Sequence, residues 1–502
     1  MAALGASPRV RTPVAPTLGR GLARPAAIAV AMGTVASMSS RFLSLAGTLL
    51  LARLLSPLDF GVANVGAFLL MVFLPLTDVG IARVLMRAQA ADLQKRARTA
   101  FWMIAALGAT LYTILFLTAD ALATIYRNQA IGATLRVVGI SIVLYSVSRI
   151  PSALLERDLR QGRKAVPDVA ASFAYAIAAV ALAYLHFGYW SIVIATVARS
   201  AVLSAGLFWM AGWGPALTFD LTAAQELITY ARMLAATSML RLVYTNVDNA
   251  IVGAVLGVRA LGYYAIAYNL GNLAAIQVAG ALGAVLYPAY TRMLPDLDRV
   301  RQAALRMLRY VGLLILPLTT IGVLVTPAAV PLILGSKWNA LTTALQVLLV
   351  YGCLHTLGPI YWSLLMARDD NAVNLRINLV SLVAALATAV PVASRYGITG
   401  VAIEFTLLEF LRLASMAWAV RSRLNLSLAL QWQALVPAIA GSLLTGTTVL
   451  ALAALYRPKN IVALAAEVFI GAAVYAGYLF GTGLLTAPDA VRAARRLTHR
   501  AA

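Results

Sequence analysis

The chain has 502 residues, of which 62% are hydrophobic and only 12% are charged. A soluble surface needs far more charge, so the composition excludes a soluble enzyme and indicates an all-α, polytopic membrane protein. The 40 Lys and Arg residues against 18 Asp and Glu lie between apolar segments, which favours topology signals over a nucleic-acid surface.

Residues 1–25 carry four arginines among Pro, Gly and Ala and show no amphipathic period. This pattern predicts a disordered, basic leader in the cytoplasm. The apolar run that follows, 26–55, is longer than the core of a cleaved signal peptide, so we expect it to remain as the first membrane span.

About twenty apolar residues are needed to cross a bilayer, which predicts about fourteen transmembrane helices. We expect them near residues 27–54, 60–82, 99–120, 132–151, 165–185, 189–211, 230–256, 261–288, 308–329, 341–366, 373–393, 398–420, 433–455 and 460–485. Short loops rich in Lys and Arg stay in the cytoplasm. The loop with Arg83, Arg87 and Lys95 is therefore expected on the cytoplasmic side, which determines the side of every other loop. Both termini are therefore expected in the cytoplasm.

Apolar and turn residues repeat at a spacing of about 200 residues. Phe60-Gly61 recurs 201 residues later as Leu261-Gly262, and the turn Phe187-Gly188-Tyr189 recurs 209 residues later as Tyr396-Gly397-Ile398. Repeats in one order imply two homologous halves, a common architecture of transporters. The expected layout is therefore two pseudo-symmetric six-helix lobes plus two C-terminal helices.

The expected organisation has six parts. They are a leader (1–25), an N-terminal lobe (26–211), a cytoplasmic amphipathic linker (212–230), a C-terminal lobe (231–424), two accessory helices (425–486) and a basic cytoplasmic tail (487–502). In the linker, Thr222 followed three residues later by Gln225 predicts a capping box that opens a helix.

Arginines within the predicted spans are the first candidates for function. An arginine at the centre of a span costs about 2.5 to 3.5 kcal/mol on the insertion scale, so it is expected to face water or a partner. Arg136 and Arg149 are close enough to helix ends to reach the headgroups. Arg41, Arg199 and Arg241 are nearer the middle, and we expect them to line an internal cavity.

Hydroxyl residues share a helical face with two of these arginines. Ser37, Arg41 and Ser44 recur at steps of three and four in the first span, as do Arg241 and Thr245 in the seventh. The six candidate substrate-binding residues are thus Arg41, Arg199, Arg241, Ser37, Ser44 and Thr245. The alternative is that the hydroxyls serve close helix packing and that Arg241 pairs with Asp248.

Acidic residues within spans are candidates for coupling to H⁺ or Na⁺. We assign this possible role to Asp78, Asp248 and Glu404. A local ion pair is the alternative for a buried carboxylate, and Glu409 with Arg412 has the spacing for one.

The remaining polar residues indicate no metal, cofactor or catalytic centre. The single cysteine, Cys353, and three scattered histidines give no transition-metal spacing. Phosphate loops and nucleophile elbows are absent from the sequence, so we expect no enzyme. His355 could titrate near neutral pH or serve as a hydrogen-bonded core residue.

Three stretches resemble the polysaccharide and O-antigen flippases of the multidrug/oligosaccharidyl-lipid/polysaccharide exporter superfamily. They are LARLLSPLDFG at 51–61, TDVGIARVLMRAQ at 77–89 and VDNAIVGAVLGVRALGYYAIAYNLGNL at 247–273. The resemblance implies two six-helix lobes around a central cavity. It also implies that the protein lies in the inner membrane of a bacterial cell, where it flips an undecaprenyl-pyrophosphate-linked oligosaccharide for lipopolysaccharide or exopolysaccharide biosynthesis.

The leading hypothesis is a non-enzymatic flippase that works by alternating access, with its arginines on the lipid-linked diphosphate. Its expected partners are that lipid-linked oligosaccharide, membrane lipids and polysaccharide polymerase or export machinery, with no nucleic acid. Two alternatives stay open. They are a cation-coupled multidrug exporter of the same superfamily and a membrane polysaccharide polymerase.

Overall fold

The computed structural model describes residues 46–78, 85, 92–158, 160–228, 247–456 and 458–484, without the side chains of Asp78 and Ala284. The expected all-α class is confirmed, since these residues form helices and contain no strand. Helices satisfy every backbone polar group within one segment, as an apolar membrane interior requires. The first bundle has a helical run at 46–54 and then α2 (Pro57–Asp78), α4 (Leu93–Ile125), α5 (Ala130–Val138), α6 (Ile140–Arg157), α7 (Gln161–Tyr184) and α8 (Trp190–Ala211).

The second bundle contains the rest of the described helices. It begins with α10 (Val247–Ile251), the π-helical turn η1 (Val252–Leu256), α11 (Val258–Gly271), α12 (Leu273–Met293) and α13 (Leu297–Ala329). It continues with η2 (Val330–Leu334), η3 (Ser336–Leu341), α14 (Thr342–Ala367), α15 (Asn371–Leu424), α16 (Leu428–Leu455) and α17 (Ile461–Gly481).

Eleven helices in the described part are long and apolar enough to cross a membrane. The 54-residue helix α15 stands for two of the expected spans, because it breaks at Gly397, whose φ of 62° and ψ of −155° suit glycine. The expected first and seventh spans are described only from residue 46 and residue 247 onward. The chain is therefore a multi-pass membrane protein, and the expected leader and tail lie outside the described residues.

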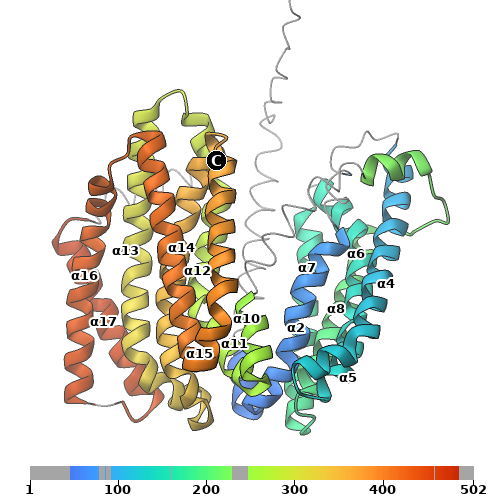
Figure 1. Cartoon of the computed structure of the whole chain (residues 1–502), viewed down its shortest axis with the longest axis horizontal. Coiled ribbons are helices and arrows are strands. Elements are labelled where there is room, and N and C mark those ends of the chain that lie inside the picture. The colour runs from blue at the N-terminus through green and yellow to red at the C-terminus, as the bar shows by residue number, and fades with distance from the viewer. Residues whose placement is uncertain are drawn as a thin grey trace, which may run out of the picture.

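The two bundles meet at one end, which we call the closed end. Figure 1 shows the bundles side by side, with α2, α10 and α11 in contact near the bottom and the helices diverging toward the top. One hydrophobic cluster spans both bundles there, joining Ala52 and Val62 of the first to Val258, Leu261 and Trp338 of the second. Burial of apolar surface therefore holds the closed end together.

The sequence Ser56-Pro57-Leu58-Asp59 starts α2 at the closed end. The Ser56 hydroxyl accepts a hydrogen bond from the Asp59 amide (3.2 Å), while the Asp59 carboxylate accepts one from the Ser56 amide (3.0 Å). This reciprocal pair is a capping box, and Pro57 occupies the first helical position, where its missing N–H costs nothing. The other Asp59 oxygen accepts from the Tyr189 amide at 3.0 Å, which anchors the start of α2 to the α7–α8 turn.

Two glycines let α2 and α11 approach to backbone contact. A Cβ atom on Gly61 would lie 1.8 Å from the Val258 carbonyl oxygen, and one on Gly262 would lie 1.9 Å from the Pro57 carbonyl oxygen. The two contacts are related by the 201-residue repeat, because Gly61 and Gly262 differ by that spacing and so do Pro57 and Val258. The closest crossing between the bundles is thus symmetric and admits only glycine.

The segment after α8 lies against α4. Helical residues 221–228 begin after Asp220, whose carboxylate accepts from the Ala223 amide at 2.7 Å and pairs with Lys95 at 2.7 Å. The predicted capping box at Thr222 and Gln225 is therefore wrong, because Thr222 lies inside the helix and Asp220 caps it. Asp is preferred over Thr as an N-cap residue, and Asp220 also pairs with Lys95 of α4.

Replacing Asp220 by Ala is expected to loosen residues 221–228 from α4, whereas Asp220→Asn keeps a capping oxygen and loosens them less. The hydrogen bond from Lys95, followed by that from the Ala223 amide, lowers the pKa of Asp220 below its usual 3.8. A carboxylate whose pKa is lowered by folding stabilises the folded state at pH values above its unfolded-state pKa. This stabilisation is lost as the pH falls through the folded-state pKa. Hydrogen exchange of the backbone amides in 221–228, corrected for intrinsic rates, should therefore become faster in acid in the unmodified protein. The two Asp220 variants should show no such acid dependence. Equal protection in Asp220→Ala would contradict this cap.

Candidate functional site

Of the six predicted substrate-binding residues, only Arg199 can be placed. Its side chain is exposed on α8 and interacts electrostatically with Asp168 and Tyr175 of α7. Arg41, Arg241, Ser37, Ser44 and Thr245 lie outside the described residues. The alternative pairing of Arg241 with Asp248 falls outside them as well.

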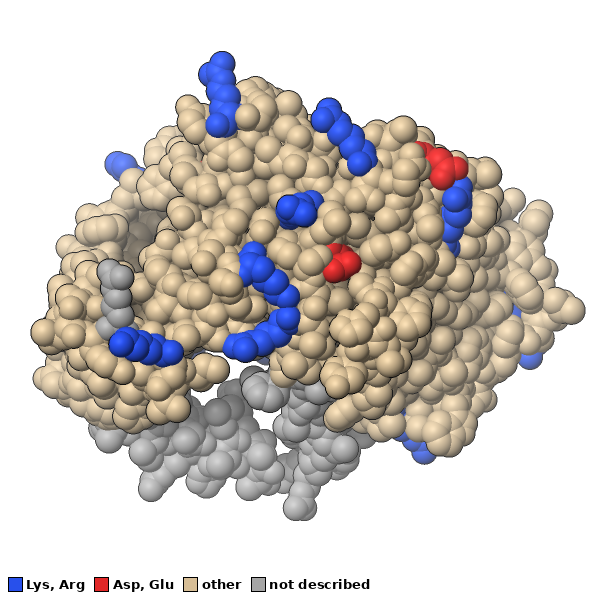
Figure 2. All heavy atoms as spheres, turned by 90° about the horizontal axis from the view of Figure 1, so that it is seen from below, with Lys and Arg blue, Asp and Glu red and all other residues tan. Residues whose placement is uncertain are grey.

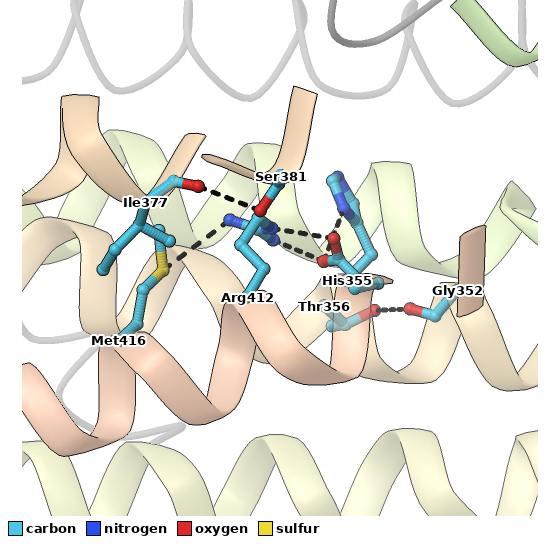
Figure 3. A network of polar contacts seen from close by, with 8 residues as sticks. Gly352, His355, Thr356, Ile377, Ser381, Arg412 and Met416 are labelled. Carbon is cyan, nitrogen blue, oxygen red and sulfur yellow. Dashed lines mark hydrogen bonds and ion pairs between the residues drawn. The ribbon is translucent and has the colours of Figure 1, made fainter. Parts of the chain in front are cut away.

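A buried ion pair lies between α14 and α15 in the second bundle. Arg412 donates to both oxygens of Glu409, with 2.7 Å from Nε to Oε2, and the side chain of Glu409 is fully buried. His355 Nδ1 lies 3.1 Å from Glu409 Oε1, and Arg412 Nη1 reaches Met416 Sδ at 3.6 Å (Figure 3). The predicted Glu409–Arg412 pair is confirmed, and His355 proves to be hydrogen-bonded to it.

Arg412 fits into this interior because α14 has a glycine opposite it. A Cβ atom on Gly358 would lie 2.9 Å from Arg412 Nη2. The guanidinium therefore packs against bare backbone, which leaves room for its bidentate contact with the carboxylate.

Two further carboxylates lie in the same bundle without a basic partner among the described residues. Asp248 is 3% exposed, and its two oxygens accept from Tyr264 Oη (3.0 Å) and from the Asn249 amide (2.8 Å). Glu404 Oε1 accepts from Thr388 Oγ1 at 2.6 Å, whereas the buried Oε2 has no hydrogen-bond partner in the described part. Buried carboxylates of this kind can hold a proton or a cation.

Aromatic rings connect these groups within the second bundle. Tyr264 interacts electrostatically with both Asp248 and Glu404, and its ring stacks on Tyr268 with centroids 6.2 Å apart. The series continues from Tyr268 to Tyr351 (6.1 Å) and from Tyr351 to His355 (5.7 Å). One packed row therefore runs from the unpaired carboxylates to the Glu409–Arg412 pair. Asp78, the third predicted coupling residue, ends α2, and its side chain is not described.

Polar contacts at the closed end join the two bundles in both directions. Arg53 donates to the carbonyls of Leu332 and Ile333, the latter at 2.7 Å. In return, Lys337 Nζ donates to the carbonyls of Arg53 and Leu55, each at 2.8 Å. We call Arg53, Lys337 and Trp338, with their carbonyl acceptors, the clasp.

Trp338 is the apolar centre of the clasp. It is fully buried, and its Nε1 donates to the Ala52 carbonyl at 2.8 Å. Phe60 and Tyr263 meet its ring edge to face, with centroids 5.4 and 5.8 Å away. A buried indole with a satisfied N–H and edge-on neighbours is a strong anchor between two surfaces.

Residues 50–343, more than half of the chain, match the family described as polysaccharide biosynthesis protein. The chain belongs to the polysaccharide biosynthesis protein family. The matched stretch contains α2, the glycine crossing and all three clasp side chains, and it ends at the start of α14.

Relatives and solved structures agree with this family. The lipopolysaccharide biosynthesis protein WzxC of Escherichia coli (strain K12) is 24% identical over 364 residues, which are 72% of this chain and 74% of WzxC. The lipid II flippase MurJ in an inward closed conformation has a TM-score of 0.73 at 12% identity, covering 90% of this chain and 99% of MurJ. An inward-facing multidrug resistance MATE family transporter of the MOP superfamily scores 0.61 at 16% identity, covering 80% and 99%. The predicted superfamily fold is confirmed.

None of the clasp residues of this polysaccharide biosynthesis protein was predicted as a site residue. Arg53 ends the first predicted span, and Lys337 and Trp338 lie in a turn of the second half. The only signal in the sequence was that all three lie in or beside predicted turns on one side of the membrane. Their contact joins segments about 280 residues apart, which only the folded chain reveals.

Proposed function

We propose that this protein flips an undecaprenyl-pyrophosphate-linked oligosaccharide across the bacterial inner membrane for lipopolysaccharide or exopolysaccharide biosynthesis. The proposal is carried by the observation that, in this member of the family, the two bundles join at one end through a glycine crossing and a clasp. The fold of a lipid II flippase supports it. Such a device moves a substrate by closing one end while the other admits it, and no bond is made or broken, so we assign the protein no enzymatic step.

In this proposal the closed end faces the outside of the inner membrane, and both termini lie in the cytoplasm. The turns predicted to be external include those at Ser56, at Gly257 and at Gly397, and they lie at the closed end. The opposite end has the connections between α6 and α7 and between α14 and α15. Arg157, Arg160 and Arg368 lie in or beside these connections, as retention of basic loops in the cytoplasm requires. The structure then corresponds to the state that loads substrate from the inner leaflet.

The arginines predicted for the cavity are proposed to hold the diphosphate. Bidentate guanidinium contacts to phosphate oxygens are strong where water is scarce. The exposure of Arg199 on α8 supports access of an anion to this residue. From their positions in the sequence, we propose the same role for Arg41 and Arg241. We also propose substrate contacts from Ser37, Ser44 and Thr245.

Cells that lack the protein test this function. Undecaprenyl-diphosphate-linked repeat units should accumulate in the inner leaflet, and surface polysaccharide should disappear, when the chain is deleted. Loss of drug efflux with unchanged surface polysaccharide would instead show a multidrug exporter. Repeat units that reach the outer leaflet but stay unpolymerised would show a polymerase.

Coupling to H⁺ or Na⁺ is proposed at Asp248 and Glu404, with Asp78 as the third candidate. We expect Glu404→Gln to abolish stimulation of transport by a proton or sodium gradient while downhill transfer continues, because an amide binds neither ion as a carboxylate does. Glu467→Gln is the matched control, since Glu467 is another buried carboxylate, on α17. Gradient-driven transfer in proteoliposomes measures both. Unchanged stimulation in Glu404→Gln would remove Glu404 from the coupling site.

A further inference from the structure

The two cations of the clasp have only neutral acceptors among the described residues. Arg53 bonds to the carbonyls of Leu332 and Ile333, and Lys337 bonds to those of Arg53 and Leu55. Both side chains are exposed. A carbonyl is a weaker acceptor for a cation than an anionic oxygen is.

The carboxylate that interacts electrostatically with Lys337 already accepts hydrogen bonds from other groups. Asp59 interacts electrostatically with Lys337, but both of its oxygens accept hydrogen bonds, from Ser56 and from the Tyr189 amide. The clasp cations are therefore available to an anion that arrives from outside the protein.

Basic side chains outnumber acidic ones on the visible face of the closed end. Figure 2 looks onto this face and shows basic side chains spread across it with few acidic ones among them. Its exposed cations include Arg53, Arg127, Arg259, Lys337, Arg395 and Lys459. A positive surface at this point attracts phosphate-bearing ligands and raises their local concentration.

Opening of the closed end would leave the clasp cations without acceptors. Each cation bonds across the contact to carbonyls of the opposite bundle, so separation of the bundles breaks all of these bonds at once. The same separation brings the substrate diphosphate to this point, if the substrate leaves between the bundles. Phosphate oxygens can then replace the lost carbonyls on both cations.

We propose that Arg53 and Lys337 form the release site for the diphosphate of the lipid-linked substrate at the outer face. The proposal rests on the proposed function and adds a second anion site, distinct from the predicted cavity arginines. In the closed state the two cations bind backbone carbonyls of the opposite bundle. In the open state they bind the diphosphate, so the ligand stabilises the open state through contacts that the closed state cannot offer.

The opening of the outer end can be measured directly. Spin labels at Tyr184→Cys and Tyr396→Cys, which are 75% and 69% exposed and lie beside external turns of different bundles, report their separation in a Cys353→Ala background. The protein is placed in sealed phosphatidylcholine vesicles with its closed end outward. Geranyl diphosphate, a water-soluble polyprenyl diphosphate, is added outside.

We expect the open fraction of the unmodified clasp to rise and saturate with geranyl diphosphate. In Arg53→Gln/Lys337→Gln, the open fraction should start higher, and half-saturation should require a concentration of geranyl diphosphate about tenfold higher or more. If the clasp only holds the bundles together, the double variant should instead bind geranyl diphosphate more tightly, because a larger open population tightens apparent binding. Tighter or equal binding in the double variant would therefore overturn the release site, as would an unmodified protein that does not respond.

Matched controls separate this site from general charge effects. Arg127→Gln/Arg395→Gln removes two exposed cations of the same face that make no clasp contact, and it should respond like the unmodified protein. If phosphatidylglycerol in the vesicles opens the unmodified protein fully and geranyl diphosphate adds nothing, the site takes phospholipid headgroups and the proposal fails. Absence of leaflet transfer by the unmodified protein would refute the proposed function separately.

Discussion

Adding one methyl group at Gly61 or Gly262 is expected to force the closed end apart and to stop transport. The new Cβ would lie 1.8 or 1.9 Å from a backbone carbonyl oxygen of the opposite helix, far inside van der Waals contact. Backbone cannot move aside as the tip of a flexible side chain can. Gly61→Ala and Gly262→Ala should therefore reduce transport by at least about tenfold, equivalent to about 1.4 kcal/mol, and favour the open outer end.

Gly280→Ala is the control for this prediction, because a Cβ at that position of α12 meets nothing within 4 Å. It should transport normally and keep the outer end closed. Distances between spin labels at residues 184 and 396 report the state of the closed end in all three variants. A closed outer end with normal transport in Gly61→Ala would show that the crossing tolerates a side chain, contrary to the geometry.

Removal of Glu409 is expected to give the largest loss of stability in the second bundle. Glu409→Ala leaves the Arg412 guanidinium, 8% exposed, without its carboxylate partner inside the bundle. Breaking a buried pair on one side costs about 3 to 5 kcal/mol, whereas replacing both members by apolar residues of similar size is often neutral. The double variant Glu409→Leu/Arg412→Met should therefore be more stable than Glu409→Ala.

Thermal unfolding of the purified protein in detergent, together with its level in the membrane, measures these effects. Asp298→Asn is a matched control, because Asp298 and Arg301 form an exposed pair with the same three-residue spacing, and exposed pairs contribute little. If Glu409→Ala and Asp298→Asn lower the unfolding temperature equally, the buried Glu409–Arg412 pair contributes no more to stability than an exposed pair does. If the double variant unfolds as easily as Glu409→Ala, the cost lies in packing rather than in the stranded charge.

Much of the fold could be predicted from the sequence because membrane spans are a matter of composition and length. Apolar runs gave the described spans, and the turn at Gly397 was predicted as the boundary between two of them. The Glu409–Arg412 pair was also predictable, because residues three apart on a helix are neighbours.

Contacts between distant segments could not be predicted in the same way. The carbonyl acceptors of Arg53 and Lys337 lie about 280 residues away and are backbone atoms, which no residue pattern identifies. The link from Asp248 to His355 through three tyrosines depends on ring packing between helices. The contact of Asp220 with Lys95 likewise joins two segments that are distant in the sequence.

Transfer of substrate between leaflets tests the central claim most directly. Purified protein is reconstituted into proteoliposomes with an undecaprenyl-diphosphate-linked oligosaccharide, and the fraction accessible to an added, impermeant glycosidase is followed with time. We predict that the protein exposes the inner half of the substrate, that Gly280→Ala does the same, and that Gly61→Ala does not. Transfer no faster than in protein-free vesicles, or a change in glycan length without transfer, would contradict the account.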